Sequence, residues 1–224
     1  MCGRYTLYQT EDLKDRFNLV TKPLIRVSDN YNVAPGQYMP IITRGEKGNT
    51  VSLMKWGLIP PWAKDINIGY KLINAKSETV FEKPMWRSPV LNNRCLVPAR
   101  GFYEWKVLSD SKTKLPFYIH PKDLDLFVFA GLWSTWEDVE KRSIMSFSIM
   151  TTEPNKEMAE VHNRMPVILH PEDEASWLEP SRRDRGSLEP LLRPYEDDGL
   201  DMYKVCEDVN SPRNNDEHLI YALE

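Results

Sequence analysis

Three apolar runs in the middle of the chain constrain its fold most strongly. They lie at residues 115–120, 126–133 and 144–150. Together they are rich in phenylalanine, valine, isoleucine and tryptophan, and β-branched and aromatic side chains favour strands. Similar runs lie at residues 39–42, 51–56 and 101–106, and a hairpin tip is expected at 45–48. The sequence therefore predicts a core built mainly from β-strands.

Short helices are expected around these strands. Leu13 and Phe17 lie four residues apart among charged residues, a spacing typical of an amphipathic helix over residues 11–18. Further helices are predicted at residues 84–92, at 155–161 and at two places within 171–201. The helix at 155–161 has a Ser/Thr capping candidate before it and a proline near its first turn. A last strand is expected at 202–206.

The first two residues carry the most unusual chemistry. Removal of Met1 would leave Cys2 as the N-terminus, so that one residue would hold both a thiol and an α-amine. Their reference pKa values are about 8.5 and about 7.7–8.0, so part of the amine is unprotonated at neutral pH. With an aldehyde, such an aminothiol forms a Schiff base that the thiolate closes into a thiazolidine. Taken alone, a start methionine followed by an arbitrary residue is the simpler interpretation.

Length and composition exclude several protein classes. The 224 residues, 41% of them hydrophobic, suit one globular domain over residues 1–224, although two would also fit. No apolar run approaches the roughly 20 residues that span a bilayer, and no signal-peptide pattern is present, so we expect a cytoplasmic protein. Cys2, Cys95 and Cys206 form no CxxC pair, and we therefore expect neither disulfides nor a metal site or other cofactor.

The distribution of charge leaves nucleic-acid binding open. The net charge of −4 argues against indiscriminate coating of nucleic acid, but it does not exclude a local basic groove. Basic residues concentrate in the middle third, at Lys71, Lys76, Lys83, Arg87, Arg94, Arg100 and Lys106. A basic face and an ordinary solvated surface are equally consistent with this distribution.

Three polar side chains stand where a site could form. Asn74 follows an apolar pair at a strand end, where it would either point into a cleft or act as a cap. Glu104 lies among aromatic residues, and loss of solvent there would raise its pKa and suit acid/base catalysis, although exposed strand glutamates are commoner. His162 and Arg164 stand at a helix-to-strand corner, and a lone histidine is more often structural than catalytic.

Taken together, six motifs resemble those of one protein family. They are Met1-Cys2-Gly3-Arg4, Tyr31-Asn32-Val33-Ala34-Pro35, Trp56-Gly57-Leu58-Ile59-Pro60, Asn74-Ala75-Lys76-Ser77-Glu78-Thr79, Gly101-Phe102-Tyr103-Glu104-Trp105 and His162-Asn163-Arg164-Met165-Pro166. Each motif alone is weak, but the ordered set is specific and covers nearly the whole chain. The chain resembles the SRAP (SOS response-associated peptidase) domain family.

This resemblance implies a mostly antiparallel, barrel-like α+β fold with peripheral short helices. It implies that the protein senses abasic sites in single-stranded DNA and shields them, in the DNA damage response, through a covalent thiazolidine at Cys2. Asn74 would hydrogen-bond the linkage, Glu104 would shuttle protons, and His162 would contact the opened sugar. The residues expected to contact DNA are Arg4, Pro35, Trp62, Lys76, Arg87, Trp105 and Arg164. The implied protein is a monomer without a cofactor, whose partners are abasic DNA, including strand junctions, and the replication machinery.

One position departs from the family pattern. The family usually has Asn-Ala-Arg where this chain has Lys76, and lysine lacks the planar pair of donors that suits phosphate. Two other functions stay open: a cysteine peptidase that uses Cys2, His162 and Asn74, and a non-covalent reader of modified DNA bases. The resemblance also allows a lyase reaction and self-removal of Met1, which an ordinary methionine aminopeptidase would achieve equally well.

Overall fold

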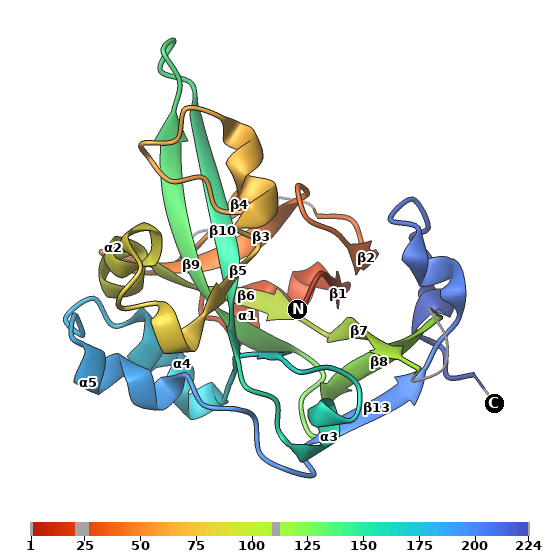
Figure 1. Cartoon of the computed structure of the whole chain (residues 1–224). Coiled ribbons are helices and arrows are strands. Elements are labelled where there is room, and N and C mark those ends of the chain that lie inside the picture. The colour runs from red at the N-terminus through yellow and green to blue at the C-terminus, as the bar shows by residue number, and fades with distance from the viewer. Residues whose placement is uncertain (1, 21–26, 109–112, 224) are drawn as a thin grey trace.

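The computed structural model describes residues 2–20, 27–108 and 113–223, and strands dominate these ranges (Figure 1). The strands are β1 Arg4–Leu7, β2 Asn30–Val33, β3 Tyr38–Gly45, β4 Gly48–Trp56, β5 Asn74–Lys76, β6 Arg94–Ala99, β7 Gly101–Val107, β8 Lys114–Pro121, β9 Phe127–Glu137, β10 Ser143–Thr152, β11 Met165–Pro166, β12 Ile168–Leu169 and β13 Leu200–Lys204. The α-helices are α1 Leu13–Arg16, α2 Pro84–Asn92, α3 Lys156–Ala159, α4 Pro171–Leu178 and α5 Arg185–Leu188. Short 3-10 helices are η1 Thr10–Asp12, η2 Ile66–Lys71, η3 Ser77–Thr79, η4 Glu189–Leu191, η5 Glu207–Asn210 and η6 Glu217–Ile220.

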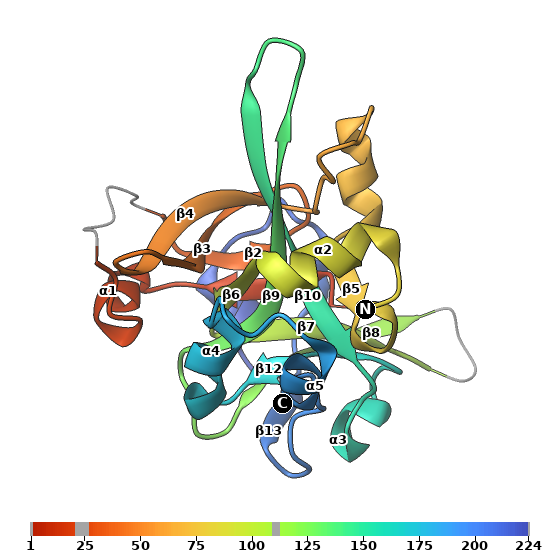
Figure 2. The same cartoon turned by 90° about the vertical axis from the view of Figure 1, so that its left-hand side faces the viewer.

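Five strands close into a barrel. Strands β10, β4, β3, β6 and β9 are neighbours in this order, and β9 also pairs with β10. The pairing of β4 with β10 is parallel, while the other four pairings around the barrel are antiparallel. Closure leaves no free edge within the barrel, which satisfies the backbone hydrogen bonds that an open sheet would expose. The β9–β10 hairpin extends well beyond the other strands (Figures 1 and 2).

A second sheet packs against the barrel. Its order is β13-β8-β7-β1-β2, and every pairing is antiparallel. One core cluster joins Tyr5 and Phe102 of this sheet to Trp56 and Phe129 of the barrel. Cys2, just before β1, belongs to the same cluster. Cys2 is thus placed between the two sheets by the packing of this cluster.

The helices cover the periphery. Trp86 of α2 and Trp177 of α4 are buried in a second cluster against the outer side of barrel strands, and Figure 2 shows α2, α4 and α5 on that side. The C-terminal turns η5 and η6 cover the second sheet, where Val209 and Leu219 pack on Tyr103. No helix in the described ranges has the length and apolar character to cross a membrane.

The observed architecture confirms the expected α+β fold of mostly antiparallel strands with peripheral short helices. The predicted helix at 84–92 coincides with α2, and the predicted hairpin tip at 45–48 joins β3 to β4. The Ser/Thr cap predicted for the helix near 155 was wrong. Asn155 caps α3 instead by accepting a hydrogen bond from the Met158 N–H at 2.9 Å, because the threonines before it belong to β10.

The turn that directly follows barrel strand β4 requires glycine. Gly57 has φ +117°, and a Cβ at this residue would lie 2.6 Å from the carbonyl oxygen of Gly69. Only a residue without a side chain fits this conformation and this close approach. The turn brings the chain from β4 into the loop that presents Trp62, where two prolines exclude regular structure as expected.

Candidate active site

Cys2 lies in the protein interior beside β7. Strand β1 runs antiparallel to β7 and pairs Arg4 with Tyr103, so the residues before Arg4 extend toward Glu104. The Cys2 side chain is fully buried. Burial raises the pKa of its thiol well above the ordinary value, and the nearby carboxylate of Glu104 raises it further. The thiol therefore needs a proton acceptor before its sulfur can attack an electrophile.

Asn74 holds the backbone of Cys2. Parallel pairing of β5 with β10 places Asn74 opposite Ile149, and its Nδ2 donates a hydrogen bond to the carbonyl oxygen of Cys2 at 2.9 Å. Its Oδ1 is buried without a hydrogen-bond partner among the described residues. Because a buried acceptor without a partner is costly, this oxygen is suited to accept a hydrogen bond from a bound group.

Glu104 and His162 face each other. Glu104 lies on β7 with only 3% of its side chain exposed, and its Oε2 is 4.0 Å from Nε2 of His162. Burial raises the pKa of Glu104, whereas nearby positive charge, including that of a protonated His162, opposes the shift. A carboxyl group in this environment exchanges protons more readily near neutral pH than an exposed glutamate does.

Two backbone contacts orient the His162 ring. The His162 N–H donates to the Met158 carbonyl oxygen at 2.8 Å at the end of α3, and the Arg164 N–H donates to Nδ1 at 3.0 Å. Nδ1 also lies 3.2 Å from the Arg164 carbonyl oxygen, so the role of each ring nitrogen depends on the tautomer. In the tautomer in which Nδ1 accepts the Arg164 N–H, the proton is on Nε2, the nitrogen that faces Glu104.

Arg164 ties the His162 corner to the Asn74 strand. Its guanidinium donates to both carboxylate oxygens of Glu78, at 2.6 and 3.0 Å, and to the Thr151 carbonyl oxygen at 2.7 Å. Glu78 lies in η3, directly after β5. Arg164 is mostly buried and its charge is paired within the protein, whereas Lys76 at the end of β5 is exposed.

Arg4 and Trp105 contact the C-terminal turn η5. The Arg4 guanidinium donates to Asn32 Oδ1 at 2.7 Å and to the carbonyl oxygens of Val209 and Asn210 at 2.8 and 3.3 Å. The indole N–H of Trp105 donates to Asn210 Oδ1 at 2.7 Å. A pocket of about 710 Å³ lies alongside, lined by Glu104, Trp105, Lys114, His162, Glu207 and Asn210 among others.

The remaining candidates lie elsewhere. Trp62 is 63% exposed and lines a separate pocket of about 310 Å³ together with Met85 of α2. Arg87 is exposed on α2, and Pro35 is partly exposed in the loop between β2 and β3. The structure thus brings Cys2, Asn74, Glu104 and His162 together, with Arg4, Trp105 and Arg164 around them. It places Trp62 at the other pocket and Arg87 on the exposed surface of α2.

Sequence reasoning assigned no role to three residues that organise this site. Glu78 pairs with Arg164, Asn210 binds Trp105, and the buried side chain of Asn32 donates to the carbonyl oxygens of Ser211 and Asn214. Glu78 and Asn32 belong to motifs that carry the family resemblance, and their place in these motifs was the one sequence feature that pointed to a role. Asn210 had none, because its contacts depend on residues that are distant in the sequence.

Comparisons with known proteins agree on one family. The family model described as SOS response associated peptidase (SRAP) matches residues 1–212. The "Abasic site processing protein YoqW" of Bacillus subtilis (strain 168) is 46% identical over 222 residues, which cover 98% of this chain and 99% of that protein. The "Abasic site processing protein HMCES" of Rattus norvegicus is 26% identical, covering 96% of this chain and 74% of that protein. An X-ray crystal structure of a Bacteroides thetaiotaomicron protein superposes with a TM-score of 0.91 at 29% identity and covers 100% of both chains.

Proposed function

Because this chain belongs to the SOS response associated peptidase (SRAP) family, we propose that it captures abasic sites in DNA through a covalent bond to Cys2. Relatives across its whole length carry the name of abasic site processing proteins. The observation that carries the proposal is the meeting of Cys2, Asn74, Glu104 and His162 at one place between the two sheets. Removal of Met1 is part of the proposal, since the reaction needs a free α-amine.

The proposed reaction is a condensation that releases one water molecule. The amine of Cys2 adds to the aldehyde carbon of the ring-opened abasic sugar and gives a carbinolamine, which loses water to form an imine. The sulfur then adds to the imine carbon, and the thiol proton passes to the nitrogen. One C–N bond and one C–S bond form, and the carbonyl oxygen leaves as water. No oxidant, reductant or metal is required.

Glu104 and His162 supply the proton transfers. Ring opening needs a proton at the sugar oxygen, which His162 supplies from Nε2, the ring nitrogen that lies 4.0 Å from Glu104. Glu104, whose pKa burial raises, takes a proton from the amine or the thiol and returns it when water leaves. Each acid/base step of this kind is typically worth about 10²- to 10⁴-fold in rate. The free Oδ1 of Asn74 can accept a hydrogen bond from the reacting nitrogen.

Single-stranded DNA is the proposed substrate form. An abasic sugar reaches an interior cysteine only where the strand is not held in a duplex, and the pocket beside Glu104 and His162 has the indole of Trp105 on its wall. A base stacked on such a ring contributes about 1–3 kcal/mol without sequence preference. Lys114 on the same wall and the exposed Lys76 supply positive charge for the phosphates.

The peptidase alternative is less well supported. A cysteine peptidase needs a thiolate that an imidazole activates. Here burial holds the pKa of the Cys2 thiol high, and the Nε2 of His162 faces Glu104. Two further activities fit the same residues. They are self-removal of Met1, which would precede crosslinking, and a lyase reaction at the opened sugar.

Denaturing electrophoresis with abasic single-stranded DNA tests the proposal. We expect the wild-type protein to give an adduct that survives denaturation, and intact DNA to give none. Cys2→Ala should abolish the adduct, whereas Cys95→Ala should retain it, since Cys95 is an equally buried thiol on barrel strand β6 that carries no α-amine. An adduct of wild-type yield in Cys2→Ala would mean that another nucleophile reacts.

A further inference from the structure

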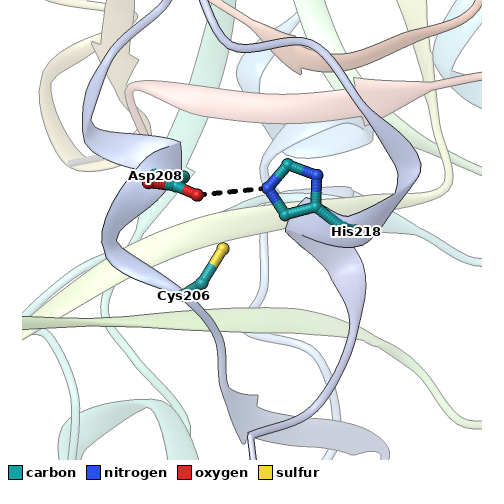
Figure 3. Close-up of side chains that lie close together, drawn as sticks. All are labelled: Cys206, Asp208 and His218. Atoms are coloured by element: carbon teal, nitrogen blue, oxygen red, sulfur yellow. Dashed lines mark hydrogen bonds and ion pairs between the residues drawn. The ribbon is translucent and has the colours of Figure 1, made fainter.

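A second cluster of reactive side chains lies at the C-terminal end of the chain, outside the proposed active site. The sulfur of Cys206, a carboxylate oxygen of Asp208 and a ring nitrogen of His218 all lie within 4.8 Å of one another (Figure 3). Cys206 and Asp208 stand at the start of η5, and His218 comes from η6. Two separate segments therefore bring three different donor types to one point.

The imidazole of His218 is oriented from behind by a carboxylate. Oδ1 of Asp216 accepts the His218 backbone N–H at 3.1 Å and lies 3.0 Å from the ring Nδ1. This contact directs Nε2 toward Oδ2 of Asp208, at 3.3 Å. A carboxylate bound to the outer ring nitrogen is the arrangement that most metal-ligating histidines use, because it fixes the tautomer and the ring orientation.

The loop that carries these side chains is already ordered by its own contacts. The carbonyl oxygen of Asp208 accepts hydrogen bonds from the Ser211 N–H at 3.2 Å and from Asn214 Nδ2 at 2.8 Å. Val209 and Leu219 anchor the two turns in the hydrophobic cluster on the second sheet. A ligand that binds here does not have to order the chain first, so little of its binding free energy is lost.

We propose that Cys206, Asp208 and His218 form a zinc site whose fourth position is open to water. Zinc accepts thiolate, imidazole and carboxylate ligands in tetrahedral geometry, with bonds of about 2.0–2.3 Å. Such bonds place ligand atoms roughly 3.3–3.7 Å apart, and the pair of Asp208 and His218 already has this spacing. Magnesium and calcium prefer oxygen ligands only, so the thiol and the imidazole select against them.

A bound ion would fasten η5 to η6, and η5 is part of the wall of the candidate active site. The Val209 and Asn210 carbonyl oxygens bind Arg4, and the Asn210 side chain binds Trp105. Zinc would thereby stabilise the position of both side chains. The zinc site does not depend on the proposed function, since none of its three ligands takes part in the crosslinking reaction.

Metal binding is best measured directly on the full chain. The chelator-treated protein is titrated with zinc in competition with a chromophoric chelator, and bound metal is counted by mass spectrometry. We expect one zinc per chain with a micromolar or tighter Kd. Cys206→Ser and His218→Gln should each weaken binding at least tenfold. Asp216→Asn should weaken it by about 10- to 100-fold through the loss of ring orientation.

Matched controls separate this site from other thiols and imidazoles. Cys2→Ala and His170→Gln should bind zinc within twofold of wild type. Cobalt should give a thiolate-to-metal absorption band in the wild type that Cys206→Ser lacks. A hundredfold excess of zinc over Kd should raise Tm by roughly 5–10 °C in the wild type but not in His218→Gln. No binding at micromolar zinc, or equal binding by the wild type and both ligand variants, would overturn the proposal.

Discussion

Glu104 is the residue at which stability and chemistry oppose each other. Burial raises its pKa in the folded state above the unfolded value of about 4.5. Between these two pKa values the folded protein holds more protons than the unfolded chain, so the free energy of unfolding falls as pH rises through this window. The ionised carboxylate therefore lowers the free energy of unfolding. A role in proton transfer would explain why a glutamate occupies this buried position.

Replacing Glu104 by glutamine should therefore separate the two effects. As the pH rises from 4 to 8, we expect the free energy of unfolding of Glu104→Gln to increase relative to that of the wild type, because the variant has no carboxylate charge to bury. Crosslinking to abasic DNA should slow by about 10²- to 10⁴-fold. Chemical denaturation at both pH values and rate measurements by denaturing electrophoresis check the two results. A variant that is less stable at pH 8 and fully reactive would contradict both.

His162 should affect the rate of crosslinking and not the binding of DNA. Its ring faces Glu104 and is held by the Arg164 N–H, so His162→Ala removes an acid/base group and leaves the exposed lysines and arginines expected to bind phosphate in place. We expect crosslinking to slow by about 10²-fold, while non-covalent affinity stays within a few-fold. His170→Ala is the matched control, because His170 stacks on Tyr195 away from this site. Equal rates for wild type and His162→Ala across about pH 6–8 would remove His162 from the mechanism.

At the scale of elements, the ion pair between Glu78 and Arg164 connects β5 to the corner after α3. Burial acts to raise the pKa of Glu78, but the hydrogen bonds from Arg164, a backbone hydrogen bond and the positive charges of Arg164 and Lys76 together outweigh it and hold the pKa below its ordinary value. A lowered pKa contributes stability above the unfolded value, and this contribution is lost as pH falls through the folded pKa. Asn74 and His162 would lose their common support at acid pH.

Glu78→Gln should consequently slow crosslinking without abolishing it. The variant keeps a hydrogen-bond acceptor for Arg164 but loses the ion pair, so the relative position of Asn74 and His162 becomes less fixed. We expect a rate loss of about tenfold, in line with what small misplacement of reacting groups costs, and a flatter dependence of stability on pH below about 4.5. The control is Glu82→Gln, whose carboxylate lies 3.8 Å from Arg185 on the surface. A wild-type rate in Glu78→Gln would show that the pair does not position the site.

The elements themselves were largely predictable, whereas their assembly was not. Strand propensity is a local property, and the apolar runs at 115–120 and 144–150 lie within β8 and β10, while the run at 126–133 overlaps β9, which begins at Phe127 and continues to Glu137. The parallel pairing of β4 with β10, which closes the barrel, joins residues about ninety positions apart and leaves no local signal. The helix expected at 11–18 is divided into η1 and α1, because its apolar stripe is too short to sustain one helix.

The candidate site was predictable only in part. The buried environment of Glu104 follows from the aromatic residues on its strand. Asn74 does not follow a strand end as predicted; it is the first residue of β5, where it holds the carbonyl oxygen of Cys2. The internal partners of Arg4 and Arg164 lie 205 and 86 residues away, so the sequence, which predicts both as DNA contacts, does not indicate their pairing within the protein. Their roles, like those of the other candidates, stay predictions.

At the scale of the whole molecule, Arg4 joins the first strand to the C-terminal turn. Arg4→Ala leaves the carbonyl oxygens of Val209 and Asn210 and the side chain of Asn32 without this donor. We expect a loss of about 2–3 kcal/mol in the free energy of unfolding, measured by denaturant titration. Arg87→Ala, at an exposed position of α2, should stay within about 0.5 kcal/mol of wild type. Equal stabilities of both variants would mean that Arg4 is not a structural tie.

Electrostatic attraction should govern the first encounter with DNA, despite the net charge of −4. The exposed cations Lys76 and Arg87 are available for phosphates, whereas Arg4 and Arg164 are engaged within the protein. In a Cys2→Ala background, which prevents crosslinking, we expect affinity for single-stranded DNA to fall markedly between about 50 and 200 mM salt.

Adding Lys76→Ala or Arg87→Ala should lower the slope of log affinity against log salt by about 0.7 for each phosphate that the protein no longer neutralises. Lys47→Ala, at the exposed tip of the β3–β4 hairpin, should leave the slope unchanged. Affinity that does not depend on salt, or an equal slope in all three variants, would place the DNA path on another face of the protein.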